Sequence, residues 1–142
     1  MKNMKVLLIM ALLVSVAIGC AGQMDAMIRR DAVRIEIIYT DSRLATAELI
    51  TVLPNGERFQ GKSQRFDRTQ AMMDAGAADS AEQSANFEAL QTFPGNARAT
   101  LTGNRGSIMK CRFSVTDYII GFSSGGFGIC QVSDGRVLDV FF

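Results

Sequence analysis

The chain has 142 residues, and its 15 Lys and Arg side chains nearly balance its 14 Asp and Glu side chains, giving a formal net charge of +1 at pH 7. This balance provides no strongly basic face, which argues against nucleic-acid binding by bulk electrostatics. The sequence contains no histidine, which excludes Ser-His-Asp and Cys-His catalysis, histidine metal sites and histidine pH switches.

The N-terminal residues have the parts of a secretory signal. Lys2 and Lys5 precede an apolar run over residues 6–18, and the small residue Gly19 follows it. A basic start, an apolar stretch and a small-residue cleavage position are typical of a signal peptide. The run is shorter than the roughly 20 residues that a membrane-spanning helix needs. We therefore expect residues 1–19 to be a cleaved signal.

The end of this segment, Ala17-Ile18-Gly19-Cys20, resembles the lipobox of bacterial lipoproteins. The resemblance implies that the Cys20 thiol carries acyl chains such as palmitate, that Cys20 is the mature N-terminus, and that the lipid bilayer is a partner. By analogy with Gram-negative lipoproteins, Ala21 favours the outer membrane, facing the periplasm. The alternatives are an ordinary signal peptide, or an uncleaved anchor with Cys20 incidental. The chain is similar to small bacterial envelope lipoproteins. This similarity implies a location in the cell envelope and a membrane anchor, but it implies no activity.

The remaining chain is the size of one small domain. Residues 20–31 show no clean hydrophobic period and are interpreted as the lipidated N-terminus and a tether. Residues 32–142 are interpreted as a β-domain that contains an insertion over residues 67–95.

Period-two alternation begins at residue 32. Val33, Ile35, Ile37 and Tyr39 alternate with polar side chains, which indicates a half-buried strand. Turn signals, among them Pro54-Asn55-Gly56, separate the apolar segments that follow. We expect strands over residues 32–40, 45–53, 57–65, 97–102, 107–116, around 130–132, and 137–142.

The insertion over residues 67–95 is rich in alanine and polar residues and poor in strand formers. Ser80 and Gln83 have the spacing of a capping box, so one short helix is possible, with Phe87 and Leu90 on its apolar face. A flexible segment is the alternative. About seven short strands joined by turns predict an all-β domain, a small antiparallel barrel or sandwich, in which the last strand closes the sheet on an early one.

Cys111 and Cys130 are the cysteines that remain after Cys20. An exported chain meets an oxidising compartment, so we expect these two to form a disulfide. Their wide spacing differs from the C-x-x-C pattern of redox enzymes, which makes a thiol-redox enzyme the weaker alternative. Both fall on the inner faces of neighbouring predicted strands.

No catalytic, metal-binding or cofactor-binding residues are expected. The glycine-serine segment over residues 121–128 precedes a strand rather than a helix, unlike phosphate-binding loops. Asp117, Asp134 and Asp139 could pair for glycoside chemistry, although acidic residues at turns usually have structural roles. The sequence predicts a membrane-anchored, non-catalytic binding or structural module with an envelope protein partner. The alternatives are a barrel that binds a small ligand such as a lipid, and an enzyme that acts on the cell wall.

Overall fold

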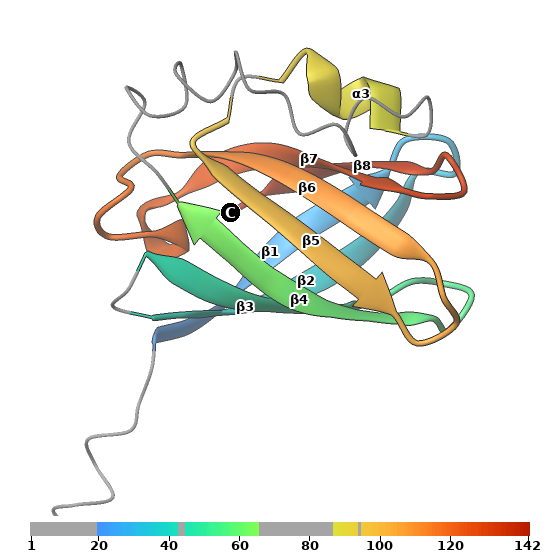
Figure 1. Ribbon diagram of the computed structural model, residues 1–142, viewed down its shortest axis with the longest axis horizontal. Helices are drawn as coiled ribbons and strands as arrows, with labels where there is room; N and C mark the ends of the chain where they lie inside the picture. The colour runs from blue at the N-terminus through green and yellow to red at the C-terminus, as the bar shows by residue number, and fades with distance from the viewer. Residues whose placement is uncertain (1–19, 43–44, 66–86, 94) are drawn as a thin grey trace, which may run out of the picture.

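The computed structural model describes residues 20–42, 45–65, 87–93 and 95–142. These residues form a closed antiparallel barrel whose strands follow one another in sequence order (Figure 1). The strands are β1 (Cys20–Ile28), β2 (Val33–Asp41), β3 (Thr46–Val52), β4 (Arg58–Arg65), β5 (Ala97–Gly103), β6 (Ile108–Val115), β7 (Gly126–Val132) and β8 (Val137–Phe141). The all-β prediction is confirmed, and of the two predicted architectures the barrel is the one observed.

The strand absent from the sequence prediction is β1. Residues 20–28 were expected to be a tether, and that expectation is wrong, because they pair with β2 along their whole length. The second half of β1 also pairs with β8, through Asp25–Ile28 and Leu138–Phe141, and this pairing closes the barrel. Met24, Ala26 and Ile28 are each only 1% exposed. The β-domain therefore begins at residue 20, not at residue 32.

Large apolar side chains from every strand fill the interior of the barrel. Along most strands, buried residues alternate with exposed or half-buried ones, as expected for a sheet with one face in the core. Strand β7 is the exception and ends in three consecutive buried residues, Cys130 to Val132. The largest buried side chains that the strands contribute are Met24, Ile28, Ile37, Leu49, Phe59, Leu101, Met109, Phe113 and Leu138. Together with Cys130 and Val132 of β7, they form one continuous core.

Three aromatic rings of the core lie across from glycines on the neighbouring strand. The directly opposed pairs are Gly22 with Tyr39, Phe59 with Gly103, and Phe113 with Gly128. A Cβ atom on Gly22 would lie 2.3 Å from the Tyr39 hydroxyl oxygen, and one on Gly128 would lie 2.4 Å from Phe113 Cδ1. The glycines therefore provide the space that the rings occupy, an arrangement used to shape curved sheets.

One buried carboxylate joins two hairpin turns at the end of the barrel remote from Cys20. Glu57, only 2% exposed, accepts hydrogen bonds from the backbone N–H groups of Arg105 and Ser107 and from the Ser107 hydroxyl. These contacts connect the β3–β4 turn to the β5–β6 turn. Because both carboxylate oxygens accept hydrogen bonds, these bonds offset the free-energy cost of burying the carboxylate.

A disulfide joins Cys111 on β6 to Cys130 on β7, as the sequence predicted. The two residues are directly opposed in the register, with their Cα atoms 4.0 Å apart. Both side chains are buried in the core. This position suits a structural crosslink rather than an accessible redox pair.

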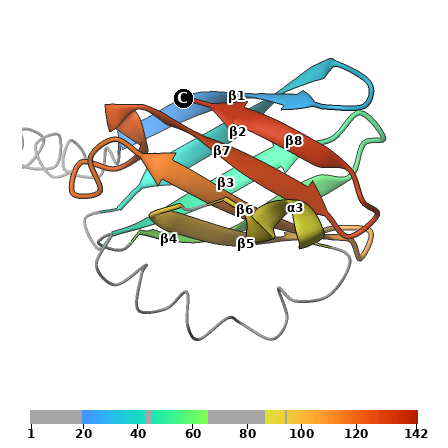
Figure 2. The same ribbon diagram turned by 90° about the horizontal axis from the view of Figure 1, so that it is seen from above.

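Helix α3 (Glu88–Gln91) is the part of the predicted 67–95 insertion with described regular structure. It lies outside the barrel over β6 and β7 (Figure 2). Leu90 is buried there, and the Ala89 N–H donates to the Gln131 side-chain oxygen. The proposed helix start at Ser80 lies outside the described residues.

The predicted glycine-serine loop over residues 121–128 is shorter in the structure. Phe122–Ser124 forms the 3₁₀ helix η3, and strand β7 already begins at Gly126. Gly126 and Gly128 therefore belong to the sheet. Gly128 is held opposite Phe113, where the absence of a side chain makes room for the ring.

The fit between Gly22 and Tyr39 is tested by a double-mutant cycle. Gly22→Ala should lower the free energy of unfolding by about 1–3 kcal/mol, because the added methyl group overlaps the Tyr39 ring. Tyr39→Leu removes the obstacle, so Gly22→Ala should cost much less in that background. Urea unfolding of the four proteins measures the coupling, and strictly additive losses would contradict the overlap.

The crosslink is tested by replacing both Cys111 and Cys130 with alanine. The loop closed by the disulfide has a sequence separation of 19, so its loss should lower the free energy of unfolding by roughly 3 kcal/mol. The unmodified protein unfolded with reductant is the matched control and should lose a similar amount. Equal urea midpoints with and without reductant would show that the crosslink does not stabilise the fold.

Candidate functional site

The site considered first is one end of the barrel, which we call the Cys20 end. The odd-numbered strands β1, β3, β5 and β7 begin here, while β2, β4, β6 and β8 end here. The connection over residues 116–125, between β6 and β7, lies at the same end as the start of β1 (Figure 2). Cys20 pairs with Asp41 across the β1–β2 register. The residue that resembles a lipidation site is therefore part of the barrel wall.

A buried ion pair supports the Cys20 end. The Arg65 Nη1 atom lies 3.0 Å from Asp41 Oδ1, and the two side chains are only 2% and 7% exposed. Arg65 also contacts Gly121, where an added Cβ would lie 1.5 Å from Arg65 Nη1. Gly121 has a φ of +96°, which also favours glycine. The ion pair thus connects the ends of β2 and β4 to the loop over residues 116–125.

Burial raises the pKa of the Asp41 carboxyl above its ordinary value. The positive charge of Arg65 and the backbone amides of Ser123 and Phe122 act in the opposite direction and lower the pKa. Arg65 is thus the main group that favours the ionised form of a carboxylate held away from water.

Hydrogen bonds within residues 116–125 fix the shape of the connecting loop. The Asp117 carboxylate accepts the backbone N–H groups of Ile119 and Ile120, at 2.9 and 3.2 Å. The Gly121 N–H donates to the Asp117 carbonyl, and the Asp117 N–H donates to the Ser124 hydroxyl oxygen. The loop is therefore an ordered turn with internal hydrogen bonds.

An aromatic cluster attaches this loop to the core. Phe122 is 1% exposed and lies against the rings of Tyr39, Phe113 and Phe142, at centroid distances of 5.6, 5.1 and 5.2 Å. These tilted and edge-to-face contacts are the favoured geometries for aromatic pairs. Phe122 therefore closes the Cys20 end of the core.

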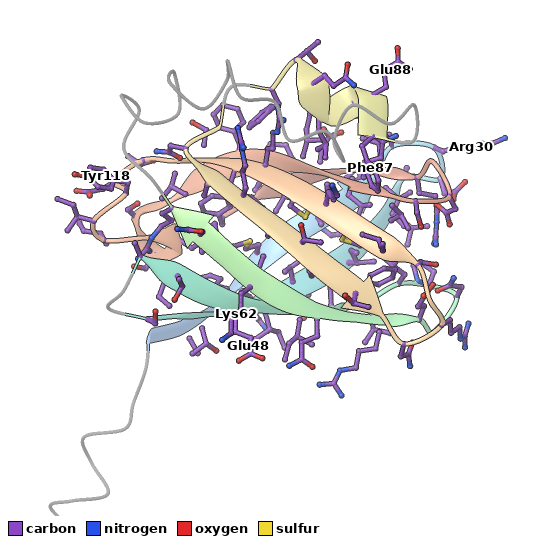
Figure 3. All side chains as sticks on the ribbon, viewed as in Figure 1. Arg30, Glu48, Lys62, Phe87, Glu88 and Tyr118 are labelled. Carbon is purple, nitrogen blue, oxygen red and sulfur yellow. A yellow bond between two sulfur atoms is a disulfide. The ribbon has the colours of Figure 1, made fainter. Side chains whose placement is uncertain are left out.

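The residues just before Phe122 point away from the protein. Tyr118, Ile119 and Ile120 are 40%, 74% and 58% exposed, and we call these three residues the loop tip. Figure 3 shows Tyr118 projecting from one end of the barrel and Arg30 from the other. Phe127 and Phe141, which are opposed on β7 and β8, are also exposed near the start of β7. Consecutive exposed apolar side chains on an ordered turn are unusual and indicate a contact surface.

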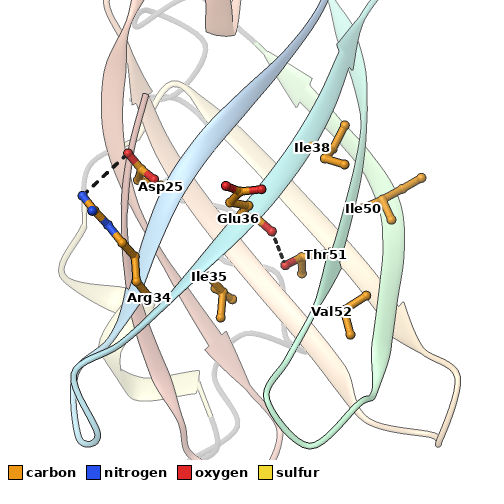
Figure 4. Close-up of a pocket in the computed structure, with 8 residues that line it drawn as sticks. All are labelled: Asp25, Arg34, Ile35, Glu36, Ile38, Ile50, Thr51 and Val52. Carbon is orange, nitrogen blue, oxygen red and sulfur yellow. Dashed lines mark hydrogen bonds and ion pairs between the residues drawn. The ribbon is translucent and has the colours of Figure 1, made fainter.

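A second candidate is a depression of about 540 Å³ on the outer face of β1, β2 and β3 (Figure 4). Its apolar lining includes Ile38, Ile50 and Val52. Asp25 and Arg34 lie 3.9 Å apart at its edge, and both are largely exposed, so this ion pair adds little stability. The depression is open to solvent and combines apolar contact area with charges, which suits a protein contact.

The three carboxylates considered for catalysis do not form one site. Asp117 holds the loop at the Cys20 end, whereas Asp134 lies in the β7–β8 turn at the other end and pairs with Arg136 at 2.7 Å. Hydrogen bonds from Arg136 lower the pKa of Asp134 against the raising effect of burial. Asp139 accepts both Arg29 Nε and Arg29 Nη2 at 2.9 Å. Each carboxylate thus has a structural partner.

No cluster of three or more histidine, cysteine, aspartate or glutamate side chains is placed to bind a metal ion within residues 20–42, 45–65, 87–93 and 95–142. Within the same residues, no helix has the length and apolar character needed to cross a membrane. Of the residues that organise the Cys20 end, Asp117 was predicted only as a possible catalytic carboxylate, and the Asp41–Arg65 pair was not singled out by sequence reasoning. The Ile119-Ile120 pair beside glycines and serines was the available signal.

Comparisons of the chain with protein-family models, with curated proteins and with solved structures found no match.

The ion pair is tested by Arg65→Met, which leaves the buried Asp41 carboxylate without its counterion. We expect a loss of about 3–5 kcal/mol in the free energy of unfolding at pH 7.5. Removing the guanidinium raises the pKa of Asp41 further, so the native state binds a proton more tightly than the unfolded state. Part of the loss should therefore be regained as the pH falls toward 4.

The control for this experiment is the double variant Asp41→Asn with Arg65→Met, which removes both charges. It should recover much of the stability at pH 7.5, and its stability should depend less on pH than that of Arg65→Met alone. A loss for Arg65→Met that is the same at both pH values would contradict an ionised, buried Asp41.

Proposed function

We propose that the protein is a lipid-anchored module of the bacterial cell envelope, held to the outer membrane through acylated Cys20 and exposed to the periplasm. The observation that carries this proposal is the sequence Ala17-Ile18-Gly19-Cys20, which resembles a lipobox and whose cysteine belongs to β1. A signal cleaved before Cys20 would leave every strand of the barrel intact.

We propose further that the module binds or supports another envelope component and does not catalyse a reaction. The described carboxylates that were considered for catalysis have structural partners, which supports this view. The buried cysteines form a crosslink in the core. A closed barrel has no open sheet edge for strand addition, so the partner would use the outer depression or the 67–95 insertion.

The alternative of a ligand-binding barrel receives less support. Small eight-stranded barrels can hold one ligand when the interior is open. Here Phe59, Phe113 and Phe122 are buried within the core together with aliphatic side chains from the other strands. A lipid would have to displace this packing.

The anchor is tested by membrane fractionation and intact mass of the full-length chain expressed in a Gram-negative host. We expect the mature protein to begin at Cys20, to carry the added mass of acyl chains, and to sediment with the outer membrane. Cys20→Ser should abolish acylation. Those molecules whose signal is still cleaved should then no longer sediment with the membrane. An unmodified Cys20 would refute the anchor.

Ala21→Asp provides a matched control that keeps the cysteine. By the sorting analogy, this variant should remain acylated but move to the inner membrane. Residue 21 is exposed, so the change should leave the barrel intact. An acylated variant with unchanged distribution would contradict the sorting assignment while leaving the lipid anchor in place.

A further inference from the structure

We propose that the loop tip, Tyr118 to Ile120, is a membrane-contact surface that inserts into the lipid interface beside the acyl chains of Cys20. The inference rests on the proposed lipid anchor and goes beyond it. It assigns a second contact between protein and membrane, and with it a fixed orientation of the barrel.

The position of Cys20 within the sheet carries the first step. Strand β1 begins at Cys20 and is paired with β2 from that residue onward. Neighbouring strands lie only about 4.8 Å apart, so acyl chains on Cys20 would hold Asp41 and the adjoining barrel wall close to the bilayer. A barrel attached in this way presents its Cys20 end to the membrane.

The second step is the connection between Cys20 and the loop tip. Cys20 opposes Asp41, Asp41 binds Arg65, and Arg65 contacts Gly121, the residue that follows Ile120. In addition, η3 packs beside β1. The loop is therefore held next to the proposed anchor by buried contacts.

The chemistry of the loop tip suits a lipid interface. It combines one tyrosine with two isoleucines, and amphipathic rings are enriched at the level of the lipid headgroups. Within the loop over residues 116–125 the charged side chain is Asp117, and its carboxylate accepts the N–H groups of Ile119 and Ile120. The backbone at the tip is thus partly satisfied internally, which lowers the cost of leaving water.

The turns at the opposite end of the barrel carry charged side chains instead of exposed apolar ones. Its β1–β2 turn carries Arg29, Arg30 and Asp31, and its β7–β8 turn carries Asp134 and Arg136. Figure 3 shows Arg30 extending from this end, away from Tyr118. This distribution favours one orientation, with the charged turns in the aqueous periplasm and the loop tip in the lipid interface.

The sequence contains no tryptophan, so a single introduced indole reports its own surroundings. The acylated full-length protein would be prepared as two variants, Tyr118→Trp at the loop tip and Arg30→Trp at the opposite end. Each would be reconstituted into phosphatidylethanolamine–phosphatidylglycerol vesicles, with or without brominated acyl chains. Flotation would confirm that each variant is attached to the vesicles.

We expect the emission of Tyr118→Trp to shift to the blue on reconstitution and to lose intensity in brominated vesicles. Arg30→Trp should show neither change, although it floats equally well. Both positions are exposed, and urea unfolding followed by the new fluorophore would verify that each variant is folded.

Equal emission from Tyr118→Trp in brominated and unbrominated vesicles, with the protein still floating, would overturn the membrane contact and leave the anchor unaffected. Equal quenching at both positions would overturn the fixed orientation. A protein that lacks acyl mass and does not float would refute the anchor and this inference together. Crosslinking of residue 119 in cells to a stoichiometric protein partner would assign the loop tip to that protein instead.

Discussion

The pairing of β1 with β8 is the constraint on which the rest of the structure depends. Four residue pairs, Asp25–Ile28 with Leu138–Phe141, convert an open meander into a closed barrel. Closure removes the sheet edges that would otherwise be open to other chains. It also brings the inner faces of all eight strands around one apolar core, which the Cys111–Cys130 disulfide crosslinks from within. Cys20 lies at the other end of the same strand and pairs with Asp41 of β2, so residue 20 belongs to the folded domain.

The position of Cys20 in a barrel strand determines how far the domain could rotate about a lipid attached to that residue. An acyl anchor on a long tether leaves a domain free to turn, whereas an anchor on a barrel strand restricts its rotation. The buried Asp41–Arg65 pair and the Phe122 cluster keep the apolar loop tip at the end of the barrel where β1 starts, which is where the proposed anchor would lie. Breaking a buried pair costs far more than losing a surface one, so this end of the barrel has a fixed shape. In the proposed arrangement, the acyl chains would supply attachment and the loop tip would supply orientation.

Most strands could be predicted from the sequence because buried and exposed residues alternate clearly, as over residues 33–39. Residues 20–28 were missed because Ala26 and Met27 differ little in hydrophobicity, which hides the period. Gly128 was placed in a loop because its strand position depends on Phe113, which lies opposite it. The Asp41–Arg65 pair was not predictable, since only barrel closure brings the ends of β2 and β4 together around Gly121. The local alternation of apolar and polar residues thus predicts most strands. The residues that form the Cys20 end are brought together only by tertiary contacts.

In the arrangement we propose, the barrel lies directly on the membrane with its Cys20 end facing the lipid. Neutron reflectometry of the acylated protein on a supported bilayer measures the distance between the headgroups and the protein layer. We expect protein density that begins at the headgroups, with no intervening layer of water. A hydrated gap between the bilayer and the barrel, such as a flexible tether would produce, would contradict it.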